Sequence, residues 1–478
     1  MFQVIKIKIN KIFKFIFLVL VFNVFSFKYS VLYGSSLNID TEYRLRGLNY
    51  LNTDFDTTTS EDSIAYYNQR LKLSIYGKLS AGRFGSEIEI YTGLQSLGIV
   101  GSTNTITVFS SSNTVSENNW QNEFPYPNTN FLPFISYAYM KLTNVNGLPV
   151  DLIMGRQPIE YGSGLIIGDN GMGYDSIRLI INYPRNYKTE IFTSKLKVNF
   201  KNRSDKDING VVISGPYKKT NFEFGYFDYQ DYSGTIYRQG LLSQPTKSIV
   251  KQFYDFRIFK KDETKGQYGI EYAIEKGEIL KSDDSKIKID NAKAYLFSAL
   301  LISQTKLGKT TVRFNVAGAS GDENIQDIND DDSSFVPDLT KRFDGLDRSG
   351  YATFLNIAPY DSLLDVFQQN YSGFGTINLK VNFSPLYGWE FGIGYYYFSA
   401  AETISGNLDA PQASKPEIYY LGQKYSLGIE RDISVKYVYS KYIDFSFVWA
   451  VYIPSSMIKV IKNTKPDEMY LFETNWRF

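Results

Sequence analysis

The chain has 478 residues, with 51 Lys and Arg against 50 Asp and Glu and a formal net charge of +1. This balance argues against a nucleic-acid-binding protein, for which a clustered basic face is expected. Histidine and cysteine are both absent, which excludes a histidine-dependent catalytic triad, a histidine metal ligand, a lipoprotein anchor and a disulfide framework. We therefore predict a protein that is not an enzyme and that has no cofactor and no metal.

The N-terminal segment has the order of a secretory signal peptide. Four lysines between positions 6 and 14 precede an apolar run over residues 15–27 and small residues at 34–36. This order predicts a signal peptide over residues 1–36, cleaved before Leu37. The alternative is a single membrane anchor, but the apolar run is shorter than the ~20 residues that a spanning helix needs.

The rest of the chain has the pattern of many amphipathic strands. Aromatic residues make up 16% of the chain, with 39 Tyr and 35 Phe, and they alternate with Lys, Glu, Asn and Ser along its whole length. The alternation predicts about 18 strands joined as hairpins, with about 16 as the alternative count, because one strand is short and the stretch near Ile180 can be divided differently. The predicted strands cover residues 37–49, 65–79, 83–94, 134–143, 150–160, 174–182, 189–198, 210–214, 221–230, 252–260, 267–276, 292–304, 310–319, 373–384, 388–400, 420–439, 443–453 and 468–478.

The connections between these strands alternate in length. Short connections follow the even-numbered strands, and long ones follow odd-numbered strands at 96–132, 161–173, 231–250, 320–372 and 402–417. Bacterial outer-membrane barrels have this asymmetry, with tight periplasmic turns and longer extracellular loops. The predicted fold class is therefore all-β, a transmembrane antiparallel up-and-down barrel over residues 37–478.

The last predicted strand has one aromatic face. Its outer series is Tyr470, Phe472, Thr474, Trp476 and Phe478, and the residues between them are mostly polar or charged. Such a strand is suited to lipid when it pairs with the first strand and closes a barrel, because closure leaves no free edge. We expect an integral protein of the bacterial outer membrane, whose partners are the lipid bilayer and the outer-membrane assembly machinery, which would recognise the strand ending at Phe478.

Charged residues alternate with apolar ones in most strands, and a charge that faces lipid near the midplane costs about 2 to 4 kcal/mol. The charged series is therefore predicted to face the lumen. Two interpretations stay open for each member: pairing across strands that stiffens the wall, or lining of a constriction that selects solutes. The pore-lining candidates are Arg44, Arg46, Arg70, Lys72, Glu87, Glu89, Arg156, Arg178, Arg257, Glu271, Arg313, Lys380, Glu430 and Asp432. The strand parity also places Tyr76, Tyr91 and Tyr396 inside, as stacking platforms for a sugar.

One segment, MGRQPIEYGSGLIIGDNGMGYDSIRLIINYP at residues 154–184, resembles the alginate export family of outer-membrane porins. The resemblance lies in Gly155, Arg156 and Gln157, then Tyr161 with a glycine-rich loop, and a strand start at Asp175 to Leu179. It implies an 18-stranded monomeric barrel that handles an anionic polysaccharide. Near the end of its strand, Arg156 can either clamp the loop that begins at Tyr161 to the wall or donate two hydrogen bonds to a carboxylate or phosphate.

The predicted function is an outer-membrane channel for passive passage or export of polar or anionic solutes, with an oligosaccharide or polysaccharide among the candidates. An anionic saccharide is the candidate soluble partner, and no nucleic acid is expected. The alternative is a structural or adhesive outer-membrane barrel whose lumen is plugged by its loops.

Overall fold

A computed structural model describes residues 32–51, 64–81, 86–99, 130–169, 171, 173–197, 205–234, 236–239, 242–262, 264–321, 331–337, 339, 343–344, 347–348, 374–400, 426–454 and 466–478. Nearly all of these residues lie in strands. The strands are β1 (Leu32–Leu51), β2 (Ile64–Ala81), β3 (Ser86–Ile99), β4 (Asn130–Thr143), β5 (Val150–Gln157), β6 (Tyr174–Asn182), β7 (Lys188–Lys197), β8 (Lys206–Tyr217), β9 (Thr220–Asp231), β10 (Ile236–Gln239), β11 (Leu242–Asp262), β12 (Gly266–Lys281), β13 (Lys286–Thr305), β14 (Gly308–Ala319), β15 (Phe343–Asp344), β16 (Asp347–Arg348), β17 (Phe374–Ser384), β18 (Trp389–Ala400), β19 (Ser426–Val438), β20 (Ile443–Pro454) and β21 (Asp467–Arg477). Two short 3-10 helices cover Val145–Gly147 and Pro184–Asn186. Among the described residues, no helix has the length and apolar character needed to cross a membrane.

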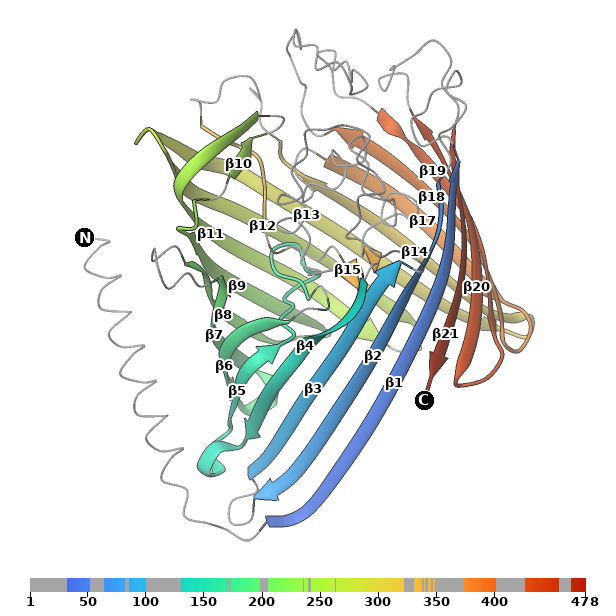
Figure 1. The fold of residues 1–478 in the computed structure, drawn as a ribbon, viewed down its shortest axis with the longest axis horizontal. Helices are drawn as coiled ribbons and strands as arrows, with labels where there is room; N and C mark the ends of the chain where they lie inside the picture. Colours follow the sequence, from blue (N-terminus) through green and yellow to red (C-terminus); the bar gives the residue numbers. More distant parts are fainter. Residues whose placement is uncertain are drawn as a thin grey trace, which may run out of the picture.

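The strands form one closed antiparallel barrel (Figure 1). Each long strand pairs with its neighbours in chain order, and β1 pairs with β21 in a register that runs from Glu42 with Arg477 to Leu51 with Glu468. The small strand β10 pairs with β11 alone among the described strands, and β15 pairs with β16 away from the wall. The wall therefore has 18 strands, which confirms the predicted fold class and decides against a count of 16.

The strand alternation produces an apolar exterior and a polar interior. On β12, Tyr268, Ile270 and Tyr272 are 48%, 60% and 42% exposed, whereas Glu271 and Glu275 between and after them are 1% and 0% exposed. Successive side chains of a strand point to opposite faces, so the exposed series faces outward and the carboxylates face inward. On β21 the aromatic series also faces outward, as predicted from the sequence.

We expect a charge on this exterior to be costly. Replacing Ile270 by arginine should lower the free energy of unfolding by about 2 to 4 kcal/mol, because a cation on the lipid face loses its hydration. The measurement is urea unfolding in liposomes, followed by the shift in gel mobility between folded and unfolded barrel. The matched control is Gln267→Arg, which lies on the inward series of the same strand and should change stability little. Equal losses in both variants would mean that the exterior assignment is wrong.

The strand boundaries correct the predicted loop at 231–250. Residues 236–239 form β10, and β11 begins at Leu242 instead of near residue 252. This stretch is polar and lacks alternation, but its backbone pairs with β9, β10 and β12, which extends the sheet at this side of the barrel.

Two other sequence predictions fall partly or wholly outside the described residues. Residues 1–31 lie outside the described residues, so the signal peptide and its cleavage before Leu37 stay predictions. Residues 32–36 form the start of β1. The predicted loops 96–132, 320–372 and 402–417 lie mostly outside as well.

Candidate functional site

Two connecting segments fold into the barrel and pack on one side of its inner wall. The first covers residues 158–169 and 171 between β5 and β6, and the second covers residues 331–337 and 339 after β14. They meet where Ile167 pairs with Leu339 in a parallel bridge and the Gly168 N–H donates to the Leu339 carbonyl at 2.8 Å. We call them the first and second inner segments.

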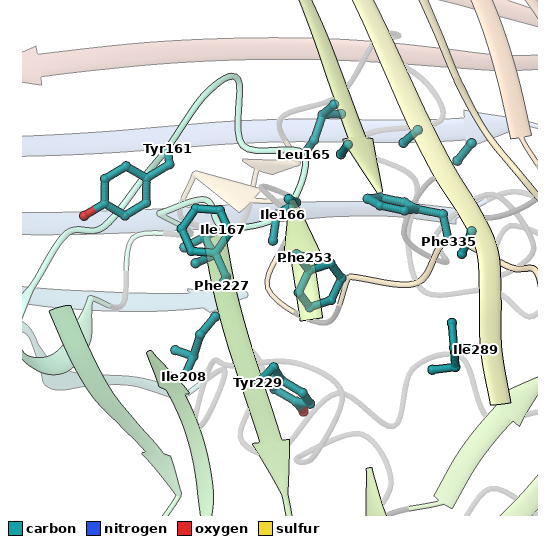
Figure 2. Packing of buried hydrophobic residues seen from close by; sticks show 14 of the residues in the cluster. Tyr161, Leu165, Ile166, Ile167, Ile208, Phe227, Tyr229, Phe253, Ile289 and Phe335 are labelled. Carbon is teal, nitrogen blue, oxygen red and sulfur yellow. The ribbon is translucent and has the colours of Figure 1, made fainter. Parts of the chain in front are cut away.

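Apolar side chains attach the first inner segment to the wall. Ile159, Tyr161, Leu165, Ile166 and Ile167 are each at most 6% exposed and share one buried cluster with the inward residues of β7 to β9 and β11 to β14. Figure 2 shows Ile166 and Ile167 of the segment next to Phe227 of the wall, with Phe253 and Phe335 beyond them. Burial of large aliphatic side chains stabilises by about 1.5 to 3 kcal/mol each, so this segment is firmly held.

Tyr161 lies where the first inner segment leaves β5. Its ring packs on Phe192 and Phe227 with centroid distances of 5.4 and 5.6 Å, and its hydroxyl donates to Glu190 at 3.2 Å. Burial raises the pKa of the Tyr161 hydroxyl well above its ordinary value, with the nearby Glu190 charge as a second cause. The hydroxyl therefore stays protonated and keeps its role as a donor.

Carboxylates of the wall hold the backbone of the same segment. The Gly162 N–H donates to Glu223, the Ser163 N–H donates to Glu271 at 2.7 Å, and Arg257 donates to the Gly162 carbonyl at 2.6 Å. Gly162 has a φ of +61°, and a Cβ there would overlap the Glu271 carboxylate and lie 2.9 Å from Asp255. Only a glycine allows the backbone this close to the acidic wall.

A buried ion pair holds the second inner segment. Lys251 and Glu275 are 1% and 0% exposed and lie 3.1 Å apart. Lys251 also donates to the Val336 carbonyl at 2.6 Å, and Glu275 accepts from the Val336 N–H at 2.7 Å. Both backbone groups of Val336 are thus bonded to one charge pair of the wall. Phe335 packs edge-on against Phe253 beside them, with ring centroids 6.4 Å apart.

The structure places every predicted pore-lining residue except Arg156 on the inward series of its strand. Several of them are paired across strands. Arg46 bonds Glu473 across the junction of β1 with β21, and Arg70 lies 2.6 Å from Glu42. These pairs fit the wall-stiffening interpretation. Tyr76, Tyr91 and Tyr396 also share the inward series of their strands, and Tyr396 is 5% exposed.

The position of Arg156 contradicts its prediction as a pore-lining residue. It is opposite Asp175 in the β5–β6 register, and that pair belongs to the outward series with Ile177 and Leu179. Its Nε and one terminal nitrogen donate to the two oxygens of Asp175 at 2.9 and 2.6 Å, so the guanidinium forms a two-bonded pair on the outside of the barrel. The physical reason is position: close to the end of β5 a charge lies beyond the apolar belt, so the cost that directs charges inward is absent there.

Sequence reasoning missed three residues of the site. Lys251 lies between the predicted loop at 231–250 and the predicted strand at 252–260 and was assigned to neither, although it continues the inward series of Phe253 and Asp255. Glu223 had the correct parity but no neighbouring charge in the sequence to indicate its role. Tyr139 is stacked on Tyr91 inside the lumen, and the alternation of β4 could have placed it there.

Two basic side chains lie next to each other on the inner face of β14 and β17. Arg313 of β14 and Lys380 of β17 are directly opposite each other in the register, and neither makes an ion pair with a described residue. Arg313 is exposed and Lys380 half-buried. Two like charges this close concentrate positive potential on the lumen side. The arrangement is unfavourable for the sheet itself, because like charges directly opposite each other destabilise it. The described residues contain no group of three or more acidic side chains that could hold a metal ion.

The fold is similar to solved structures of outer-membrane proteins from Pseudomonas aeruginosa. OccK8 (OprE) gives a TM-score of 0.51 at 11% identity, covering 93% of this chain and 98% of that one. The outer membrane protein OpdK gives 0.50 at 10% identity, covering 92% and 99%, and OccK2 (OpdF) gives 0.50 at 9%, covering 93% and 99%. No family model and no curated protein matches the sequence.

At these sequence identities the similarity establishes the fold alone. The surface of the barrel indicates that it lies in a lipid bilayer. A closed barrel with an apolar exterior satisfies every backbone group of its wall and requires lipid around it. The chain is therefore an integral β-barrel of the outer membrane. The comparisons support an outer-membrane β-barrel fold in general and do not identify the alginate export family.

Proposed function

We propose that the chain is an outer-membrane porin through which small polar and anionic solutes diffuse passively. The proposal takes the turn end of the barrel, where the strands are joined by short turns such as residues 183–187 and 306–307, as the periplasmic side. The two inner segments would narrow the lumen from the wall of β7 to β14, and the part of the inner surface that they leave free, with Arg313 of β14 and Lys380 of β17, would line the path. No covalent chemistry is involved.

The observation that carries this proposal is that Arg313 and Lys380 lie side by side on the inner wall without an ion pair to any described residue. Glu223 of β9 and Glu271 of β12 are already engaged by the first inner segment through Gly162 and Ser163. Arg313 and Lys380 make no such contact with a described residue, which favours passage of anions beside them.

The test is single-channel recording of the purified folded protein in a planar bilayer, with the reversal potential measured under a salt gradient. Stable conductance with a preference for anions is the expected result. Silence from barrels that migrate as folded on gels would refute the channel and favour a structural or adhesive barrel with a plugged lumen.

Reversing the basic charges should reverse the preference. A unit charge about 4 Å from an ion contributes about 1 kcal/mol even in bulk water, which corresponds to roughly a fivefold change in local ion concentration. The double variant Arg313→Glu with Lys380→Glu is therefore expected to shift the reversal potential toward the cation value. The control is Lys293→Glu on the outward series of β13, which should leave the reversal potential unchanged. A wild-type reversal potential in the double variant would contradict the assigned anion path.

Two finer parts of the sequence-based hypothesis belong to this proposal. The resemblance to the alginate export family extends the range of proposed solutes to anionic oligosaccharides. A preference for small anions over polymers in the same recordings would restrict that range to small anions. Recognition of the C-terminal strand by the assembly machinery is supported by outward Phe472, Trp476 and Phe478, which are 51%, 39% and 68% exposed.

A further inference from the structure

Three tyrosines form a row across the inner wall in the half of the barrel near the turn end. Tyr76, Tyr91 and Tyr139 are directly opposite one another in the registers of β2, β3 and β4. Ring centroids are 4.7 Å apart between Tyr76 and Tyr91 and 4.6 Å apart between Tyr91 and Tyr139, and the latter two rings are inclined by 14°. Tyr91 and Tyr139 therefore stack along the circumference of the wall, and Tyr76 is inclined by 40° to Tyr91 at the other end of the row.

The row ends at a position that has no side chain. Gly155 of β5 is the partner of Tyr139 in the register and is exposed. Its φ of +115° and the close approach of the Ala138 carbonyl leave no room for a Cβ. Among the described residues, Tyr91 is the ring that stacks on Tyr139, so the face of Tyr139 toward Gly155 has no ring on it. At the other end, Tyr76 has the side chain of Asn38 as its neighbour.

Paired charges lie around the Tyr139 end of the row. Lys141 and Glu89 lie 3.6 Å apart on the turn-end side, and the Tyr91 hydroxyl donates to Glu89 at 3.2 Å. On β6, Arg178 is two residues from Ser176, which is the register partner of Gly155. Its charge acts on the Tyr139 hydroxyl, and it lies 3.8 Å from Glu190. Donors and acceptors are present in equal measure, and the net charge of these four groups is near zero.

We propose that the face of Tyr139 above Gly155 is a subsite for a neutral pyranose ring. An aromatic face packs on the apolar face of a sugar ring, and the flanking charge pairs offer acceptors and donors to hydroxyl groups, each of which needs both. A net anion would find no excess of positive charge at this position, unlike at Arg313 and Lys380. The subsite rests on the proposed channel only in that the ligand must enter the lumen.

The test measures binding and does not depend on conduction. Galactose, its acyclic counterpart galactitol and the anionic galacturonate are titrated against the folded full chain in a detergent without a sugar headgroup, by ligand-detected NMR. Galactose is expected to bind best of the three. Tyr139→Ala and Tyr139→Leu should each raise its dissociation constant roughly two- to twelvefold, the range of a lost ring-stacking contact. Tyr139→Phe, which keeps the ring, and Tyr76→Ala, at the other end of the row, should bind as wild type.

Two outcomes would overturn the subsite: galactitol binding as well as galactose, or wild-type affinity in both variants that lack the Tyr139 ring. Tighter binding of galacturonate that persists in those variants would assign saccharide binding to the basic wall instead. The channel and the subsite fail separately. A barrel that is silent in a bilayer but binds galactose through Tyr139 keeps the subsite and loses the channel, and a conducting barrel without ring-dependent binding does the reverse.

Discussion

Replacing Lys251 by methionine is expected to destabilise the barrel more than any other single change considered for this chain. The substitution leaves Glu275 buried without its partner and removes the donor to the Val336 carbonyl. Removing one member of a buried ion pair typically costs about 3 to 5 kcal/mol, because the remaining charge has lost its hydration. The expected results are a lower unfolding midpoint in urea and faster hydrogen exchange over residues 331–337.

The matched variant removes both charges. Lys251→Met combined with Glu275→Leu leaves no orphaned charge, so it should be more stable than Lys251→Met alone, although the second inner segment still loses its backbone bonds. Hydrogen exchange over residues 331–337 should stay fast in both variants, while the unfolding midpoint recovers only in the double variant. A double variant that is less stable than the single one would mean that the pair is not the main anchor of that segment.

The alternation of apolar and charged residues was sufficient to predict the barrel. Membrane strands must place an apolar residue at every second position, so the wall is encoded locally and each predicted strand has a counterpart among the described ones. The C-terminal strand is a clear case, because Phe472 and Trp476 on one face and Glu473 and Asn475 on the other leave one orientation that suits lipid.

The contents of the barrel were less predictable. Leu165, Ile166 and Ile167 lie in a glycine-rich connection, and their apolar character signals burial but does not say against which wall. That choice depends on Glu223 and Glu271, which are distant in sequence and meet the segment only after the barrel closes. Arg156 was misplaced for a related reason, because the rule that turns charges inward holds only within the apolar belt.

Replacing Gly162 by alanine is expected to displace the first inner segment and raise the single-channel conductance. A non-glycine residue at a φ of +61° costs about 1 to 2 kcal/mol, and the added Cβ would overlap the Glu271 carboxylate. Gly162 takes no part in the backbone pairing of the wall strands, so the barrel should remain folded while the Gly162 and Ser163 bonds are lost. Limited proteolysis of residues 158–171 provides a second measurement of the displacement that does not depend on conduction.

The control for backbone strain is Gly234→Ala. Gly234 has a similar φ of +69°, but the nearest atom to an added Cβ is the Thr246 carbonyl oxygen at 3.6 Å, so this variant has the strain without the clash. Its conductance should match the wild type, and the first inner segment should stay protected. Equal behaviour of the two variants would mean that the close contact of Gly162 with the acidic wall does not hold the segment. A larger conductance in Gly162→Ala alone would identify the acidic wall as the element that sets the width of the pore.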